Sequence, residues 1–192
     1  MKHFTIHTLC GLLLFCLMIE AASASQNFTL TGNVLGPSCS VSADSQYDFG
    51  VLSATDVHGE SGTSKMMGAP LHLALKCTGS RGGMDQKSTL MITGKQFSTD
   101  AWPEEAKNSC FLDSSSSVKN SCIFLSKTVS TEDILTVDKK GNDVIAELPV
   151  DNIQTDGSPT FINLTPGVMG WSDNNAQSGV LRAVISVSLV WK

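Results

Sequence analysis

Apolar and polar residues alternate in short runs along most of this chain, and the longest such run lies at its C-terminal end. From Leu181 to Trp191 every second residue is apolar. A period of two over this length is typical of a β-strand that buries one face. No further strand follows this one in the sequence, so we expect its outer edge to require a partner from elsewhere.

Further short runs predict about eight or nine strands in all. We expect them at residues 28–34, 47–52, 70–77, 90–92, 122–125, 134–137, 144–148, 160–164 and 181–191. Gly-Pro, Gly-Ser, Gly-Asn and Asp-Gly pairs between the runs favour turns. Residues 101–107, with Pro103 in the first turn, are predicted as a brief helix. The pattern predicts an all-β chain folded as one antiparallel sandwich of immunoglobulin-like type.

The first 24 residues have the pattern of a secretory signal peptide. Lys2 gives a weakly positive start, and the apolar run from Leu9 to Ile19 is too short to span a bilayer. Ala22 and Ala24 supply the small residues of a cleavage site. A membrane anchor is the alternative interpretation. We expect cleavage after Ala24, which leaves an N-terminal arm at residues 25–36 and one folded domain at residues 37–192.

The cysteine count agrees with export into an oxidising compartment. Two of the six cysteines, Cys10 and Cys16, lie in the signal segment. The others are Cys39, Cys77, Cys110 and Cys122. An even number in an exported chain indicates two disulfides, for which three connectivities are possible. We favour Cys39–Cys77 and Cys110–Cys122; the second would close a short Ser-rich hairpin.

Composition and charge narrow the classes of partner. Charged residues make up 16% of the chain, and Ser, Thr and Gly are abundant, as in β-rich secreted proteins. The net charge is −5 and no basic run is visible. Nucleic acid and anionic membrane surfaces are therefore not expected as partners.

The sequence carries no pattern that indicates catalysis or metal binding. A secreted hydrolase is the main alternative from another class, but no G-x-S-x-G motif occurs. His58 and His72 are the only histidines after the signal segment, and no CxxC pair is present. His72 lies in an alternating apolar run and should face solvent, whereas Glu104 and Glu105 are adjacent and project apart. We expect no enzyme activity, no metal and no cofactor.

Three separated motifs resemble those of chaperone–usher pilins, the subunits of bacterial surface fimbriae. The first is Phe28-x-Leu30-x-Gly32-x-Val34-x4-Cys39-x-Val41, and the second is the alternating run Leu71-x-Leu73-x-Leu75-x-Cys77. The third begins at Gly179, fourteenth from the end, and continues to a penultimate aromatic residue, Trp191. The motifs cover both ends of the chain and the first disulfide, while residues 78–164 fit by their general β character.

The resemblance implies an incomplete immunoglobulin-like sandwich that lacks its seventh strand and is completed by donor-strand exchange. A periplasmic chaperone would fill the open groove first, and at the outer-membrane usher the arm of the next subunit would replace it. The donor strand would carry Phe28, Leu30, Gly32 and Val34. The acceptor groove and chaperone-binding edge would comprise Gly179, Leu181, Ala183, Ile185, Val187, Leu189, Trp191 and Lys192, with the Lys192 carboxylate as an anchor for basic chaperone residues.

The resemblance also implies a role. The short arm is similar to that of minor tip subunits, so we expect a minor or adaptor subunit that supports cell adhesion at the cell surface. A major shaft pilin and a single-domain fimbrial adhesin that binds a host receptor directly are the alternatives. The Ser-rich segment 113–117 is expected as a surface loop, with receptor recognition as its alternative. Trp102 would stack on a sugar if exposed and fill the core if buried.

Overall fold

The structure, a computed structural model, describes residues 37–43, 46–50, 52, 63–79, 87–118, 120–171 and 179–191. The chain divides into two compact units, Met1–Val34 and Leu35–Lys192, and every described residue belongs to the second. Some predicted features lie outside the described residues. They are the signal peptide, the arm with Phe28, Leu30, Gly32 and Val34, and also His58 and Lys192.

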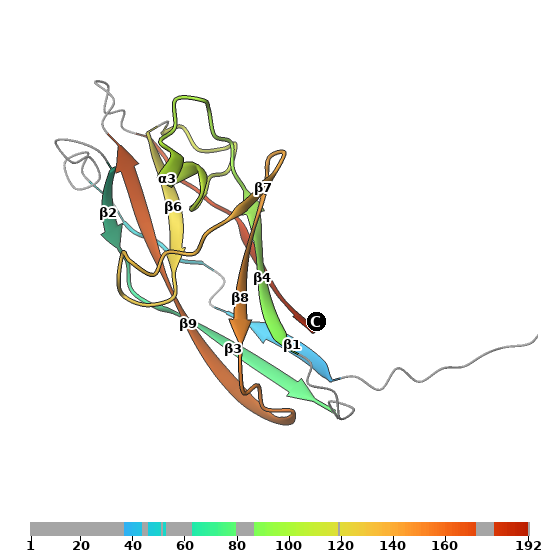
Figure 1. The fold of residues 1–192 in the computed structure, drawn as a ribbon. Coiled ribbons are helices and arrows are strands. Elements are labelled where there is room, and N and C mark those ends of the chain that lie inside the picture. The colour runs from blue at the N-terminus through green and yellow to red at the C-terminus, as the bar shows by residue number, and fades with distance from the viewer. Residues whose placement is uncertain are drawn as a thin grey trace, which may run out of the picture. The chain divides into compact units, whose positions relative to one another are not determined.

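Two antiparallel sheets make up the described part of the second unit (Figure 1). One sheet has the order β1 (Ser38–Ser42), β3 (Leu71–Thr78), β9 (Asp156–Trp171), β6 (Ser121–Ser126) and β5 (Cys110–Phe111), with β2 (Thr63–Met67) also paired to β9. The other has the order β10 (Ile185–Trp191), β4 (Ser88–Lys95), β8 (Asp143–Val150) and β7 (Asp138–Lys140). The sheets pack as a sandwich, which confirms the prediction of an all-β antiparallel fold.

The main core forms between the two sheets because their strands alternate apolar and polar residues. On β3, Leu73, Leu75 and Cys77 are buried while His72 and Lys76 are exposed. The facing sheet contributes buried residues from β4 and β8: Leu90, Ile92, Val144, Ala146 and Val150. Each large apolar side chain buried in this way contributes about 1.5–3 kcal/mol to folding.

Strand β9 is long enough to take part in both halves of its sheet. Its first half pairs with β3, and its side chains alternate between exposed and half-buried. Its second half pairs with β2 on one edge and β6 on the other, and every residue from Leu164 to Trp171 is buried. The prediction for residues 160–164 found only the middle of this strand, because Pro166 and Gly167 interrupt the apolar pattern.

Two of the predicted strands are wrong. Residues 46–50 form an irregular segment in which the Gly50 amide donates to Asp48 Oδ1 at 2.8 Å, and Gly50 has φ +68°. Residues 135–137 are irregular as well, since the Leu135 amide donates to Leu125 O and the Val137 amide to Asn108 O. Tyr47 and Phe49 pack on each other, and Leu135 and Val137 are buried in the main core, but in neither segment do the backbone bonds form a ladder.

The short strands and the helix differ from the sequence-based prediction. Strands β2 and β7 carry little alternation, and β1 alternates over only five residues. The helix is limited to α3 (Glu104–Lys107), and Pro103 lies just before it in extended conformation instead of in its first turn. A proline at this place is tolerated because its missing amide would have no partner inside the helix.

The two disulfides join the cysteines in the pairing that the sequence favoured. Cys39 on β1 is bonded to Cys77, its direct partner on β3. Cys110 on β5 is bonded to Cys122 on β6. Disulfides of this kind are characteristic of proteins in oxidising compartments.

Candidate functional site

The C-terminal strand forms one edge of its sheet. β10 pairs with β4 over its whole length, from Ile185 opposite Gly94 to Trp191 opposite Ser88. Among the described residues no other strand pairs with β10. A strand of this length that is paired along one side presents backbone amides and carbonyls along the other side, where a further strand can add.

The inward side chains of β10 are only partly covered. Ile185, Val187 and Leu189 are half-buried and pack against the main core, as does Trp191. By contrast, Leu90 and Ile92 on the neighbouring strand β4 have 0% exposure. The difference shows that the core is closed beside β4 and incompletely covered along the outer side of β10.

The edge of the other sheet lies next to this incompletely covered side. β1 pairs with β3 alone in the described part of the chain, and it lies beside β10 (Figure 1). Its inward residues Cys39 and Val41 are half-buried against the same core. Two sheet edges that are not paired with each other therefore flank a strip of half-covered apolar side chains. We call β1, β10 and this strip the open edge.

Residues 179–182, which precede β10, pair with the loop between Cys110 and Cys122. Arg182 O accepts hydrogen bonds from the Asp113 amide and the Ser116 hydroxyl, both at 2.9 Å, and the Arg182 amide is 2.9 Å from the Ser116 oxygen. Val180 O accepts from the Ser117 amide at 2.9 Å, and the Val180 amide donates to the Ser117 hydroxyl at 2.8 Å. The Ser-rich loop is therefore bound to the chain just before the C-terminal strand.

Gly179 lies close to residues 117 and 118 of this loop. A β-carbon at Gly179 would lie 2.5 Å from Ser117 Oγ and 3.0 Å from Val118 Cγ2. At such distances the side chains of Ser117 and Val118, or the loop that carries them, would have to shift. The glycine that the resemblance placed at the start of the acceptor groove thus has a local reason, the packing of residues 117–118 against it.

A second apolar cluster lies beneath the loop and beside α3. Its buried members are Trp102, Ala106, Cys110, Leu112, Cys122, Phe124, Met169 and Trp171, and Leu181 packs against it. Trp102 is 4% exposed and its ring centroid is 5.0 Å from that of Trp171. Trp102 therefore fills the core. A shallow pocket of about 590 Å³ above the two rings is lined by Phe97 and by loop residues that include Ser114 and Asn120.

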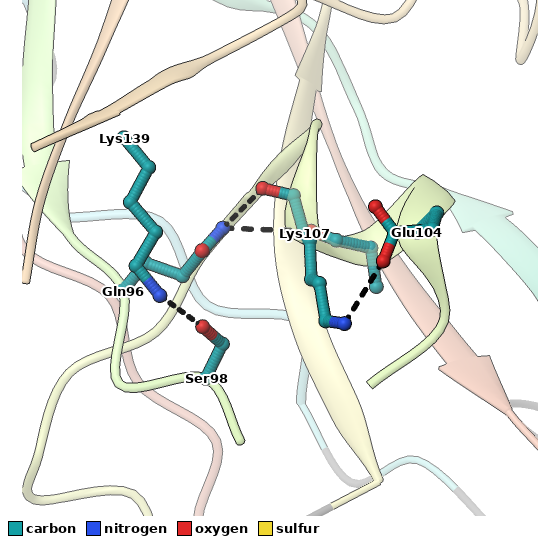
Figure 2. A network of polar contacts seen from close by, with 6 residues as sticks. Gln96, Ser98, Glu104, Lys107 and Lys139 are labelled. Carbon is teal, nitrogen blue, oxygen red and sulfur yellow. Dashed lines mark hydrogen bonds and ion pairs between the residues drawn. The ribbon is translucent and has the colours of Figure 1, made fainter. Parts of the chain in front are cut away.

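The second cluster is fixed to the sheet by Gln96, a residue that the sequence analysis did not single out. Its side chain has 0% exposure, and its amide nitrogen donates to Cys110 O at 2.7 Å and to Lys107 O at 2.9 Å (Figure 2). Around it, Lys107 forms an ion pair with Glu104 at 2.9 Å, and Lys139 donates to the Ser98 hydroxyl (Figure 2). The sequence indicates this role of Gln96 only by placing a polar residue directly after an alternating strand.

Charged groups link α3 to β2 on the surface. The Lys65 ammonium pairs with the Glu105 carboxylate, which also accepts from the Thr63 hydroxyl at 2.6 Å. These two donors, Lys65 foremost, hold the pKa of Glu105 below its usual range. The arrangement is that of a surface ion pair and presents no group poised for proton transfer.

The remaining residues weighed for chemistry do not gather into a site. His72 is exposed on β3, as the alternation predicts, and its Nδ1 is 2.7 Å from Asn163 Oδ1. Within the described ranges, no three His, Cys, Asp or Glu side chains lie close enough together to hold a metal ion. No helix in those ranges is long and apolar enough to cross a membrane.

The structure thus brings the predicted acceptor residues from Gly179 to Trp191 into one continuous segment along the open edge. The predicted donor residues and Lys192 lie outside the described part of the chain. A scan of the chain against protein-family models finds no matching model, and a search of curated proteins finds no match.

Proposed function

We propose that this protein is a structural subunit of a bacterial surface fimbria that polymerises by donor-strand exchange. The open edge is the observation that supports the proposal most strongly. An apolar strip left between two sheet edges is a hazard for aggregation unless another strand covers it. Addition of an extended segment would pair the backbone of β10 and place alternate side chains on the strip.

In this proposal the fold is an immunoglobulin-like sandwich that lacks one strand, and the missing strand belongs between β10 and β1. It would cover the half-buried side chains of Ile185, Val187 and Leu189 on one side and of Cys39 and Val41 on the other. Every strand pair in the described sheets is antiparallel, so we assign the added strand an antiparallel course along β10.

The added strand in the assembled fimbria is the N-terminal arm of another subunit. In this chain the arm carries Phe28, Leu30 and Val34 at alternate positions, and these would occupy the acceptor strip of the neighbour. Gly32 would pass a shallow part of the strip. Before assembly, a periplasmic chaperone would cover the open edge, with the Lys192 carboxylate as its anchor, and an outer-membrane usher would exchange it for the arm.

The other properties of the chain agree with this role. The N-terminal 24 residues would direct export, and the two disulfides suit the periplasm and cell surface. We assign the protein no catalytic activity and no cofactor. We place it as a minor or adaptor subunit near the fimbrial tip, because the arm before Phe28 is short.

Deletion of residues 26–34 tests the donor half of the proposal. The truncated subunit should still be captured by its chaperone, because the open edge is intact, and should fail to attach to the subunit ahead of it. Co-purification with the chaperone and incorporation into surface fimbriae measure the two properties separately. Normal incorporation of the truncated subunit would disprove the linking role.

A matched variant tests the acceptor half. Val187→Asp places a charge in the middle of the half-buried strip, where a covering strand would have to desolvate it, whereas Ser188→Asp places the same charge on the exposed side of β10. The first variant should lose capture by the chaperone and the second should retain it. Equal capture of both variants would contradict the assignment of the open edge as the binding surface.

A further inference from the structure

The loop closed by the Cys110–Cys122 disulfide pairs with the segment just before β10, at the point where β4 has ended. In the ladder between β10 and β4, Ile185 is opposite Gly94, so residues 180–182 would lie beyond the end of β4 at Lys95. At that point the chain from Leu112 onward lies beside the C-terminal segment in place of β4. The Leu112 amide donates to Lys95 O at 2.8 Å, and the next residue, Asp113, donates to Arg182 O.

The hydrogen bonds also show which edge of this segment the loop occupies. In an extended segment the N–H and C=O of one residue point to one side, and those of the next residue point to the other. Val180 and Arg182 both direct their backbone groups to the loop. Val184 O lies 3.1 Å from the β-carbon position of Gly94, so the even-numbered residues also face β4.

Residues with odd numbers therefore direct their backbone groups to the outer side, from Leu181 onward. The same residues carry the half-buried side chains. Leu181 packs on the second cluster, whereas Ala183 and Ile185 pack on the main core. The outer edge thus runs without a break across both cores, although the regular strand begins only at Ile185.

The loop also has supports of its own, in addition to its bonds to residues 180 and 182. Cys110 and Cys122 both have 0% exposure, and Gln96 holds the Cys110 carbonyl. Within the loop, Asp113 accepts from the Ser115 amide at 2.9 Å and from the Ser116 amide at 3.0 Å. A turn that is preformed in this way presents its serines to residues 180 and 182.

From these contacts we infer that the disulfide-closed loop is a brace that continues the sheet in place of β4 and extends the acceptor edge back to Leu181. This inference rests on the proposed function and specifies the partner. An edge from residue 181 to 191 is about 34 Å long, against about 20 Å for β10 alone. The partner is an extended strand of the longer length, with alternate apolar residues and no proline where its amides must pair. The arm at residues 25–36 of a subunit like this one meets the length requirement.

A double-mutant cycle on a donor-complemented chain tests the inference. A copy of residues 25–36 is fused after Lys192 through a flexible linker, either complete or without its last three residues, which face Leu181 in the antiparallel arrangement. The brace is weakened by S116A/S117A, which removes the hydroxyls that contact Arg182 and Val180. S114A, at an exposed serine of the same loop, is the control.

In the native sequence and in the control, shortening the donor should lower the melting temperature by about 2–4 °C or more. In S116A/S117A the same shortening should change it by under about 1 °C, because the far end of the edge is no longer held in place. Amide hydrogen exchange at Leu181 and Ala183 gives an independent readout: the complete donor should slow it in the native sequence and not in S116A/S117A.

The outcomes separate this inference from the proposed function. If the complete donor gives no stabilisation in the native sequence, the proposed function is wrong and the inference falls with it. If the donor stabilises the chain but its shortening costs the same in S116A/S117A, the brace is wrong and the acceptor edge stands. Should the double variant fail to fold, S117A alone, which loses only the contact to Val180, is measured in the same cycle.

Discussion

Gln96 is a fully buried polar residue whose side chain bonds to several elements. It lies at the end of β4, and its side-chain amide donates to carbonyls at the C-terminal end of α3 and at Cys110. Helix ends leave carbonyls without partners inside the helix, and a buried carbonyl that loses its partner is costly. One side chain thus connects the second sheet, the helix and the disulfide-closed loop.

Replacement of Gln96 by alanine should lower the free energy of unfolding by about 2–4 kcal/mol, because at least two buried carbonyls lose their donor and a cavity remains. Denaturant unfolding of the donor-complemented chain measures the change. Gln154→Ala, at an exposed position, is the matched control and should cost under about 0.5 kcal/mol. A small, equal effect of both substitutions would show that the network contributes little.

Gly179 offers a second test at the scale of one residue. Gly179→Val places branched methyl groups against Ser117 and Val118, where even a single β-carbon is too close. We expect the loop to shift and amide exchange at Val180 and Arg182 to become faster. Gly141→Val is a control for the general cost of replacing glycine, since open space surrounds that β-carbon position while the positive φ of +66° still disfavours valine. Unchanged exchange in the Gly179 variant would mean that the loop contact is loose.

At the scale of elements, the attachment of β2 to α3 depends on the ionisation of Glu105. The native pKa of Glu105 is below its ordinary value of 4.5. The ion pair with Lys65 therefore stabilises the fold fully above that value, and this contribution is lost as the pH falls through the lower native pKa. The Glu105 side chain is 42% exposed, so solvent screening limits the contribution to about 1 kcal/mol or less.

The Glu105→Gln variant should accordingly be less stable than the native sequence at pH 7 and equally stable near pH 3. Thermal melts of both proteins across this range measure the difference. Glu132→Gln, a substitution of another exposed glutamate, controls for the loss of one negative charge. A difference between the Glu105 variant and the native sequence that stays constant with pH would rule out the ion pair as its source.

Sequence patterns predicted those strands in which the residues themselves alternate between apolar and polar. β3, β4, β8 and β10 alternate apolar and polar residues, and each is found close to its expected place. β1 and β2 are strands because β3 and β9 bind them, and nothing in Thr63–Met67 alone shows this. Tyr47 belongs to a predicted strand at residues 47–52, but its ring packs on Phe49 and its hydroxyl contacts the Ala69 amide.

Part of the candidate site could likewise be predicted from its own residues, and part could not. The half-buried face of residues 181–191 could be predicted from alternation, since burial of one face follows from it. The contact between the disulfide-closed loop and residues 180–182 could not be predicted, because its hydrogen bonds join residues more than sixty positions apart, such as Ser116 and Arg182 at a separation of 66. Four consecutive serines indicate an exposed polar loop in any context, and only the fold shows which backbone groups they reach.

At the scale of the whole molecule, the two cores differ in how completely they are covered. The second cluster is closed by the loop, α3 and the Cys110–Cys122 disulfide, while the main core keeps half-buried residues along β10 and β1. A domain in this state is missing apolar burial that a complete sandwich would have. Its stability should therefore depend on a strand supplied from outside.

The mature chain alone should fold slowly or aggregate, and fusion of a donor segment at its C-terminus should stabilise it strongly. Burial of three or four further apolar side chains would contribute about 1.5–3 kcal/mol each before the ordering of the donor is subtracted. Melting temperature and size-exclusion behaviour measure the effect. A donor in which the apolar residues are replaced by serine is the control, and equal melting with either donor would contradict the incomplete sandwich.

If the chain links others in a row, as we propose, the Cys39–Cys77 disulfide has a mechanical consequence. Tension that enters from residues before Pro37 reaches β1 first. An edge strand pulled from one end normally peels away from its neighbour one hydrogen bond after another. Here peeling must stop at Cys39, the second residue of the strand, because the covalent bond passes the force directly to β3. We expect the interior strands to share the load while β1 remains attached.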